Sequence, residues 1–168
     1  MVGVRDHRCF EDIITCDREE KITNICDYII KIAQISSALK DYNYENETDM
    51  KLFFRGQTNR SYGVLPSIFR ENRIRNEAAA VKELTLLVPG EFDMQVPLFD
   101  KLTKMQHYGL PTRLLDITAN PLVALFFSCW EYDKNKNINH DGEIIMIIDE
   151  PVTPEDRAAS YFCRLAEY

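Results

Sequence analysis

The stretch QHYGLPTRLLDITANP, residues 106–121, decides how the rest of the chain is interpreted. It is rich in polar side chains, although the segments on both sides of it are apolar. Before it, Leu98, Leu102 and Met105 recur at helical spacing and predict a helix over about 97–108. The stretch is therefore predicted to be a loop that gathers polar groups between two buried elements.

The end of this stretch is a strong helix start, because Asn120 is a good cap and Pro121 suits the first helical position. The helix that it opens, LVALFFSCW at 122–130, is apolar on every side, so we expect it to be buried all round. Downstream, EIIMIID at 143–149 is too short and too β-branched for a helix and predicts a buried strand. A last helix is predicted to begin at 153–154.

The first third of the chain predicts a long helix followed by a strand. Residues 17–40 carry apolar side chains at helical spacing, and Asp17 with Glu20 forms a capping box. The polar, acidic residues 41–50 predict a surface loop. KLFFRG at 51–56 then predicts a short strand, because aromatic side chains favour strands.

The mixture of elements predicts the α+β class, with helices packed on a small mixed sheet. Good helix formers at 76–88 add a further helix, which Pro89 and Gly90 end. The strand at 143–149 needs a partner, which is either the strand at 51–55 or a segment beyond the end of this chain. We favour the second and expect a domain that is incomplete at its C-terminus, because the last helix also stops without a cap or glycine.

Composition and charge limit the function classes. The 168 residues are 45% hydrophobic and 28% charged, and they contain no secretory signal or membrane-spanning stretch, so we expect a soluble, cytoplasmic protein. Five cysteines without a C-x-x-C pair fit a reducing compartment, and three scattered histidines argue against a metal site. A net charge of −7 argues against generic nucleic-acid binding. Residues 51–118, however, carry ten basic and seven acidic side chains, which suits a small anionic ligand.

A first candidate site lies at the end of the strand at 51–56. Arg55 directly follows two aromatic residues, and a buried arginine needs a partner, either an internal carboxylate or a ligand phosphate. Gly56 removes a side chain beside it and would let a ligand approach the backbone. Gln57 completes the group. An internal ion pair is the structural alternative for Arg55.

A second candidate site lies in the loop at 106–121, which leads into the N-terminus of a buried helix, where anions are favoured. The structural alternative is a tight loop in which Arg113 pairs with Asp116 while Thr118 and Asn120 act as caps. That alternative leaves His107, Tyr108 and Thr112 without a role. The candidate residues are His107, Tyr108, Thr112, Arg113, Asp116, Thr118 and Asn120.

Both candidate sites fall on motifs that resemble the FRG domain family. The family shows FRGQ, an aromatic residue, an LPS turn and a long MQHYGLPTRLLDWT signature followed by PLVALYFA. The matching segments here are FRGQ at 54–57, LPS at 65–67, MQHYGLPTRLLDIT at 105–118 and PLVALFFS at 121–128, together with Tyr62, Arg70 and Glu77. The sequence departs from the signature at Ile117 and Ser128, and neither departure removes a polar group.

The layout also looks like the ADP-ribosyltransferase pattern, in which a strand ends in Arg-Gly and a later Ser/Thr segment leads into an apolar helix. Arg55-Gly56 would match the first feature, and Thr112 or Thr118 the second. The resemblance implies NAD as a ligand, held by a phosphate contact to Arg55, with His107 at a ribose hydroxyl. The catalytic carboxylate would lie beyond residue 168, and Asp116 is the acid inside the signature.

These motifs imply a nucleotide-like anion as the ligand, with NAD among the candidates. The implied chemistry is ADP-ribosyl transfer or cleavage of the NAD glycosyl bond. We assign catalytic roles to Arg55, His107 and Asp116 and ligand contacts to the other candidate residues. The alternative is a non-catalytic interaction or sensor module whose partner is unknown. The expected domain boundaries are an N-terminal helical segment (1–44), the FRG domain (45–150) and the start of a further helix (151–168).

Overall fold

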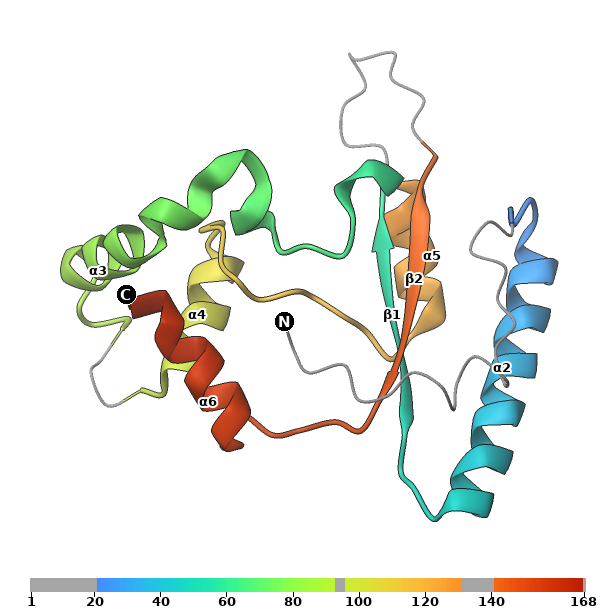
Figure 1. The fold of residues 1–168 in the computed structure, drawn as a ribbon. Helices are drawn as coiled ribbons and strands as arrows, with labels where there is room; N and C mark the ends of the chain where they lie inside the picture. Colours follow the sequence, from blue (N-terminus) through green and yellow to red (C-terminus); the bar gives the residue numbers. More distant parts are fainter. Residues whose placement is uncertain (1–20, 93–95, 131–140, 168) are drawn as a thin grey trace. The chain divides into compact units, whose positions relative to one another are not determined.

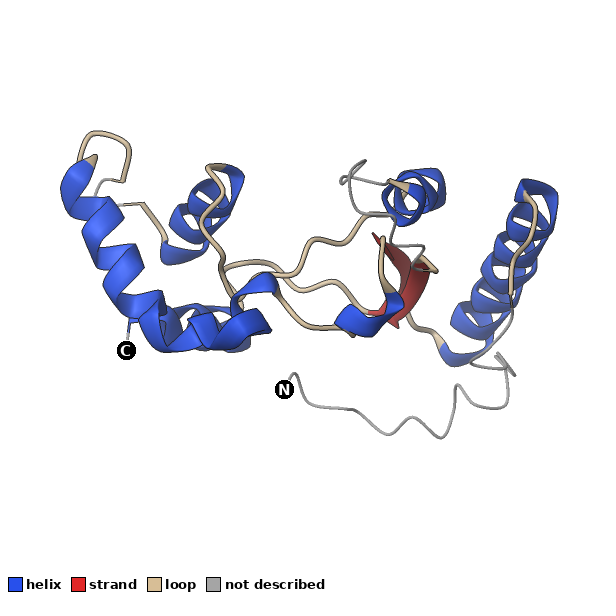
Figure 2. Cartoon of the chain, turned by 90° about the horizontal axis from the view of Figure 1, so that it is seen from above, coloured by secondary structure: helices blue, strands red, loops and turns tan. Residues whose placement is uncertain are grey.

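The computed structural model describes residues 21–92, 96–130 and 141–167 of the chain. The chain divides into two compact units, which are treated separately below. The first unit contains the chain up to Leu52 together with Ile148–Glu150, and the second contains Phe53–Ile147 and Pro151–Tyr168. Helices dominate the described residues, and Figure 2 shows their two strands in red.

The first unit contains one long helix, α2 (Ile25–Asn46). Its cap is Asn24, whose side chain accepts a hydrogen bond of 2.9 Å from the backbone N–H of Asp27. The side chains of Tyr28, Ile35 and Leu39 are buried. The predicted capping box of residues 17 and 20 lies outside the described residues.

Helix α2 ends six residues later than predicted, so the expectation of a loop from residue 41 is wrong. The side-chain oxygen of Asn43 accepts hydrogen bonds from the Thr48 hydroxyl, at 2.8 Å, and from the Met50 N–H, at 3.1 Å. Glu47 ends the helix in the left-handed conformation, with φ of 53°. These local bonds hold a polar segment in helix that composition alone assigns to a loop.

The sheet has two strands, β1 (Lys51–Gln57) and β2 (Glu143–Asp149), which run antiparallel (Figure 1). Both predicted strands are confirmed. Strand β2 pairs with β1, which is the partner not favoured from the sequence. Within the described residues β1 also forms an isolated antiparallel bridge, in which the N–H and C=O of Phe54 bond Thr118 at 2.7 and 2.8 Å. Phe54 is thereby buried, and the loop before α5 is fixed to the strand.

Helix α5 (Pro121–Cys129) begins where the sequence predicts, with the Asn120 side chain accepting from the N–H of Leu122. It lies against the two strands in Figure 1, and glycines make this possible. A Cβ on Gly56 would lie 1.7 Å from the Ala124 carbonyl oxygen, and one on Gly142 would lie 2.1 Å from that of Ser128. The backbone of α5 therefore occupies the space that side chains would otherwise fill.

The expectation that α5 is buried all round is wrong. Ala124 is fully buried against the strands, but Leu122, Phe126 and Phe127 are each about half exposed. Only the face that carries Ala124 packs within the described part of the chain. Strand β2 is likewise half-buried rather than buried. The predicted incompleteness of the domain stays a prediction.

The second unit contains further helical segments, and those after residue 76 hold most of its apolar core. The further segments are the 3₁₀ helices Arg60–Tyr62, Ser67–Asn76 and Leu165–Glu167, and the helices α3 (Glu77–Leu87), α4 (Leu98–His107) and α6 (Arg157–Arg164). The buried core residues are Val81, Phe92, Leu102, Met105, Cys163 and Ala166. In α3 and α4 the predicted helices are confirmed, and Gly109 has the left-handed φ of 91° expected after α4. No described helix has the length and apolarity needed to cross a membrane.

Helix α6 begins three residues after the predicted start at 153–154. Its cap is Asp156, whose carboxylate accepts a hydrogen bond of 2.8 Å from the N–H of Ala158. Aspartate is a strong cap because its oxygen satisfies a helix N–H that would otherwise lack a partner. The acidic residue thus sets the start of the helix, and the Thr-Pro pair precedes it as a turn.

Candidate functional site

A hollow of about 200 Å³ lies where β1 ends, between the 3₁₀ segments and the C-terminal end of α5. Strand β1 delivers consecutive residues to it, and its two arginines come from different elements. All of its lining residues belong to the second unit. They are Arg55, Gly56, Gln57, Thr58, Tyr62, Arg70, Phe127 and Trp130.

Arg55 has a backbone carbonyl as its partner where a carboxylate or phosphate was predicted. Its Nη1 donates a hydrogen bond of 2.8 Å to the backbone oxygen of Asp116, while its Nε is buried without a partner. Burial lowers the pKa of the guanidinium, the Asp116 carboxylate opposes that shift, and the charge of Arg70 adds to it. Arg55 therefore retains hydrogen-bonding capacity that no described group uses.

Arg70 brings a second positive charge to the same hollow. Its guanidinium carbon lies 3.9 Å from the centre of the Tyr62 ring, a cation–π contact that fixes the side chain. Its Nε is buried without a partner. Within the described residues no carboxylate forms a salt bridge with either guanidinium of the hollow.

Gln57 is held by a carboxylate on the neighbouring strand. Its side-chain Nε2 donates a hydrogen bond of 2.8 Å to Oε2 of Glu143, the first residue of β2. The residue is only 5% exposed, and its Oε1 is buried without a partner. The Gln57 amide therefore has an unused acceptor, Oε1, in the same hollow as the unused Nε donors of Arg55 and Arg70.

In the described part of the chain, three buried side-chain nitrogens or oxygens lack a hydrogen-bond partner: Arg55 Nε, Gln57 Oε1 and Arg70 Nε. All three belong to residues that line this one hollow. Such atoms are rare in native proteins, because each costs about 1–3 kcal/mol of stability. Half-exposed Phe127 and Trp130 supply apolar walls. The hollow is therefore suited to a ligand with an anionic group, a hydrogen-bond donor and a flat apolar part.

The loop at 106–121 forms a separate hydrogen-bonded network. The buried Thr112 hydroxyl donates to Oε1 of Gln106 at 2.6 Å and accepts from the N–H of Leu114 at 3.3 Å. Nε2 of Gln106 donates in turn to the Asp116 carboxylate at 2.8 Å. Because Asp116 also receives Arg55 on its backbone oxygen, the network reaches the edge of the hollow without lining it.

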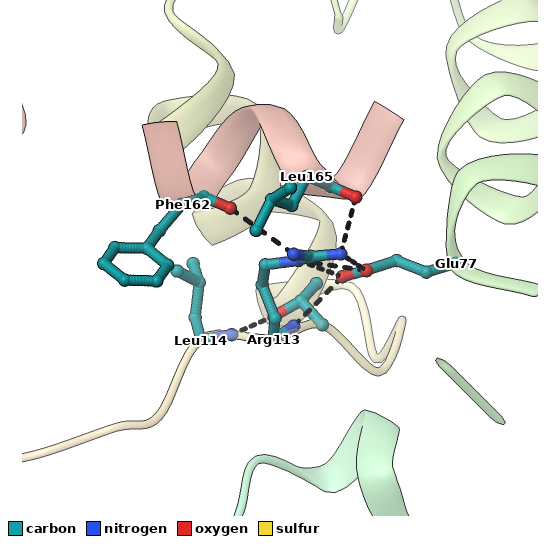
Figure 3. Close-up of polar contacts among 6 residues, drawn as sticks. Glu77, Arg113, Leu114, Phe162 and Leu165 are labelled. Carbon is teal, nitrogen blue, oxygen red and sulfur yellow. Dashed lines mark hydrogen bonds and ion pairs between the residues drawn. The ribbon is translucent and has the colours of Figure 1, made fainter. Parts of the chain in front are cut away.

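Arg113 is tied to Glu77 at the start of α3, as Figure 3 shows. The predicted pair of Arg113 with Asp116 is wrong, because the guanidinium points toward α3 and α6 instead. Its Nε lies 3.0 Å from Oε2 of Glu77, and its Nη2 donates to the backbone oxygen of Leu165 at 2.7 Å. A weaker bond of 3.4 Å reaches the oxygen of Phe162. Arg113 therefore holds the helices of the core together.

The other candidate residues of the loop lie outside the hollow. His107 and Tyr108 are exposed at the end of α4, with their ring centres 6.4 Å apart. The Thr118 hydroxyl accepts from the N–H of Asn120, and Asn120 caps α5, so both serve as the caps expected in the structural alternative. Their predicted ligand roles, and those of Thr112, Arg113 and Asp116, stay predictions.

The structure thus groups three of the predicted residues, Arg55, Gly56 and Gln57, in one place. For Gly56, packing against α5 accounts for the missing side chain, since no ligand could enter the space that Ala124 fills. Sequence reasoning missed the aromatic walls and did not select Arg70. The signal for Arg70 was present in the cluster of arginines between residues 55 and 75.

A second, larger hollow of about 330 Å³ lies beside α4 and α6 and includes Leu98, Phe99, Cys163 and Arg164. None of the unpartnered buried atoms belongs to it. Burial raises the pKa of the Cys163 thiol, which keeps it protonated and poorly nucleophilic. Within the described residues no group of three or more histidine, cysteine or acidic side chains could hold a metal ion.

Comparison with known proteins gives the class of this chain. The family model of the FRG domain matches residues 50–137, which is more than half of the chain and contains both candidate sites. The chain belongs to the FRG domain family. No curated protein and no solved structure matches it, so the implied likeness to ADP-ribosyltransferases has no support from these comparisons.

Proposed function

We propose that this FRG domain binds a nucleotide-like anion, with NAD among the candidate ligands, in the hollow at the end of β1. One observation carries the proposal. Arg55, Gln57 and Arg70, the three residues that carry the unpartnered buried atoms, all line that hollow. A ligand that pairs with these atoms would remove a cost that the folded chain otherwise bears.

The charges of the hollow favour an anion. The guanidiniums of Arg55 and Arg70 repel each other, as the effect of Arg70 on the pKa of Arg55 indicates. A phosphate between them would accept hydrogen bonds from both, and guanidinium–phosphate bonds are roughly twice as strong as neutral ones. The net charge of the whole chain is −7, so this is a local preference for a small anion.

The aromatic walls favour a ligand with a flat ring. Phe127 and Trp130 line the hollow and are each about half exposed, so they could stack on a base. The volume of about 200 Å³ is smaller than the ~300–1,000 Å³ of most small-molecule pockets. We therefore expect the hollow to take the charged part of a nucleotide, with the base along its open aromatic rim.

Binding, rather than chemistry, is the proposed function. Transfer of ADP-ribose or cleavage of the NAD glycosyl bond needs a carboxylate near the oxocarbenium-like transition state. Among the described residues no aspartate or glutamate lines the hollow, and Asp116 is exposed and bonded to Gln106. The transferase activity that the resemblance implies would thus need an acid from outside the described lining of the hollow.

The test is calorimetric titration of the full chain with NAD, ADP-ribose and ADP. Arg55→Ala and Arg70→Ala should each weaken binding about tenfold or more, because a hydrogen bond to a charged group contributes about 1.5–3 kcal/mol. Arg75→Ala is the matched control, since Arg75 is exposed on the same 3₁₀ segment as Arg70 and lies outside the hollow. The proposal fails if none of the three compounds binds, or if the control loses as much affinity.

A non-catalytic interaction module is the second candidate, and α5 supplies the observation for it. The exposed apolar side chains of Leu122, Val123 and Phe126 lie on one helix, and such patches often mark contact surfaces. In that case Arg55 is part of an internal scaffold. Arg55→Ala would then lower the melting temperature and reduce the unfolding free energy by about 1.5–3 kcal/mol, whereas a ligand-binding role leaves most of the stability intact.

A further inference from the structure

We infer that the ligand of the hollow presents a hydrogen-bond donor to Oε1 of Gln57, and that Glu143 is the positioning residue that turns this acceptor toward it. The inference rests on the proposed function and specifies which chemical group the site selects. It assigns a role to the contact between the ends of the two strands, where Gln57 is the last residue of β1 and Glu143 the first of β2.

The orientation of the amide follows from its partner. An amide has one donating end and one accepting end, whereas an ionised carboxylate only accepts. Glu143 Oε2 therefore takes the Nε2 end of Gln57, at 2.8 Å, and leaves Oε1 as the end that is free. The reverse orientation would place two oxygens against each other without a proton between them. Antiparallel pairing of the strands brings the two side chains together and so fixes this choice.

The free acceptor cannot be satisfied by bulk water. Gln57 is 95% buried, as its exposed fraction of 5% shows, and no described group donates to its Oε1. The residue lines the hollow, so we assign Oε1 to a donor of a ligand that binds there and displaces the groups that shield this oxygen from water. The arginines alone would bind any phosphate, whereas Gln57 adds the requirement for a hydrogen-bond donor.

The combination fits a nucleoside diphosphate. Its phosphates suit the guanidiniums of Arg55 and Arg70, and it carries donors in its ribose hydroxyls and, for adenine, an exocyclic amine. A site built to bond such a donor discriminates strongly against an analogue that lacks it, because the buried acceptor is then left unpaired. Selectivity between matched analogues is therefore the measurable consequence.

The experiment compares ADP with two analogues on the full chain. One is 2′,3′-dideoxy-ADP, which lacks both hydroxyls, and the other is purine riboside 5′-diphosphate, which lacks the amine. Together they remove every neutral donor of ADP. At least one analogue should bind about fivefold or more weakly than ADP, as expected for one lost hydrogen bond.

Glu143→Gln tests the positioning role. The substituted side chain can donate as well as accept, so Gln57 becomes free to turn, and the ratio between ADP and the weaker analogue should fall to near one. A purely structural role would weaken all three nucleotides equally and leave the ratio unchanged. Glu150→Gln is the control, because Glu150 is exposed and lies just beyond the opposite end of β2.

Each other result is decisive. If ADP and both analogues bind with affinities within about fivefold, the inference is overturned and the proposed function stands. If NAD or ADP-ribose binds but ADP does not, the inference alone fails. If none of these compounds binds, the proposed function fails and the inference fails with it. An unchanged selectivity ratio in Glu143→Gln overturns the role of Glu143. The wild-type comparison with the analogues needs no variant, so it remains decisive even if a substitution impairs folding.

Discussion

Arg113 and Glu77, which lie 36 residues apart in the sequence, form an ion pair in the core of the second unit. The Glu77 side chain is 3% exposed and that of Arg113 18%. The same guanidinium donates to backbone oxygens at Phe162 and Leu165, where α6 ends. The C-terminal end of α6, which has no local capping residue or glycine in the sequence, is thus capped by an arginine from a distant loop. One side chain connects α3, the loop before α5, and α6.

The ion pair predicts a large loss of stability in Glu77→Gln. Removing one charge leaves Arg113 partly buried without its counterion, and such a change costs about 3–5 kcal/mol of unfolding free energy. Chemical denaturation of wild type and variant measures this loss. Glu83→Gln, on the exposed face of the same helix, should change the unfolding free energy by less than about 0.5 kcal/mol. Equal losses in the two variants would contradict the prediction.

The contact between Gly56 and α5 predicts that even one methyl group is not tolerated. In Gly56→Ala the new Cβ would lie 1.7 Å from the Ala124 backbone oxygen, so the helix or the strand must shift. We expect a loss of more than about 3 kcal/mol, beyond the usual cost of overpacking, because backbone cannot move aside as a flexible side chain does. Gly90→Ala, with open space around it, is the control and should have nearly wild-type stability in the same denaturation experiment.

Tyr28 predicts a loss of stability at alkaline pH. Burial in α2 raises the pKa of Tyr28 to about 12, from an ordinary value of 10.0. The folded state therefore holds the phenolic proton more tightly than the unfolded state, so the stabilisation is complete below pH 10 and is lost as the pH rises toward 12. Melting curves across that range should show a steeper decline for wild type than for Tyr28→Phe. Identical slopes would contradict the assignment of the decline to Tyr28.

The local signals in the sequence predicted most elements, because those elements depend on local chemistry. The cap at Asn120, the left-handed Gly109 and the strand at 51–57 follow from neighbouring residues and are all present. Errors arose where a distant or unforeseen contact decides the outcome. Helix α2 extends because Asn43 bonds the segment after it. Arg113 has a partner 36 residues away where the sequence offered Asp116 three residues away.

In the candidate site, too, the features set by local sequence were predicted and those set by distant contacts were not. Arg55 and Gln57 were predicted from a polar group that follows buried aromatic residues, and both line the hollow. The arginine cluster marked Arg70 as a candidate, but which of its arginines joins the site, and that Trp130 joins it too, depends on how the 3₁₀ segment and α5 meet the strand. Gly56 was assigned to ligand access, although its lack of a side chain is explained by the backbone of α5. A glycine in the sequence indicates that something packs closely against the backbone, but it does not show whether that neighbour is a ligand or a helix.

Thr112 allows a test that separates scaffold from ligand contact within the loop. The side chain of Thr112 is fully buried and its hydroxyl bonds Gln106 and the N–H of Leu114, so Thr112→Val leaves two partly buried groups without a partner. We expect a loss of about 1–3 kcal/mol in unfolding free energy, with the affinity for ADP unchanged at temperatures where the variant is folded. Calorimetric titration and denaturation of the same sample measure both. A loss of affinity about as large as that in Arg55→Ala, with stability intact, would instead place the hydroxyl against the ligand.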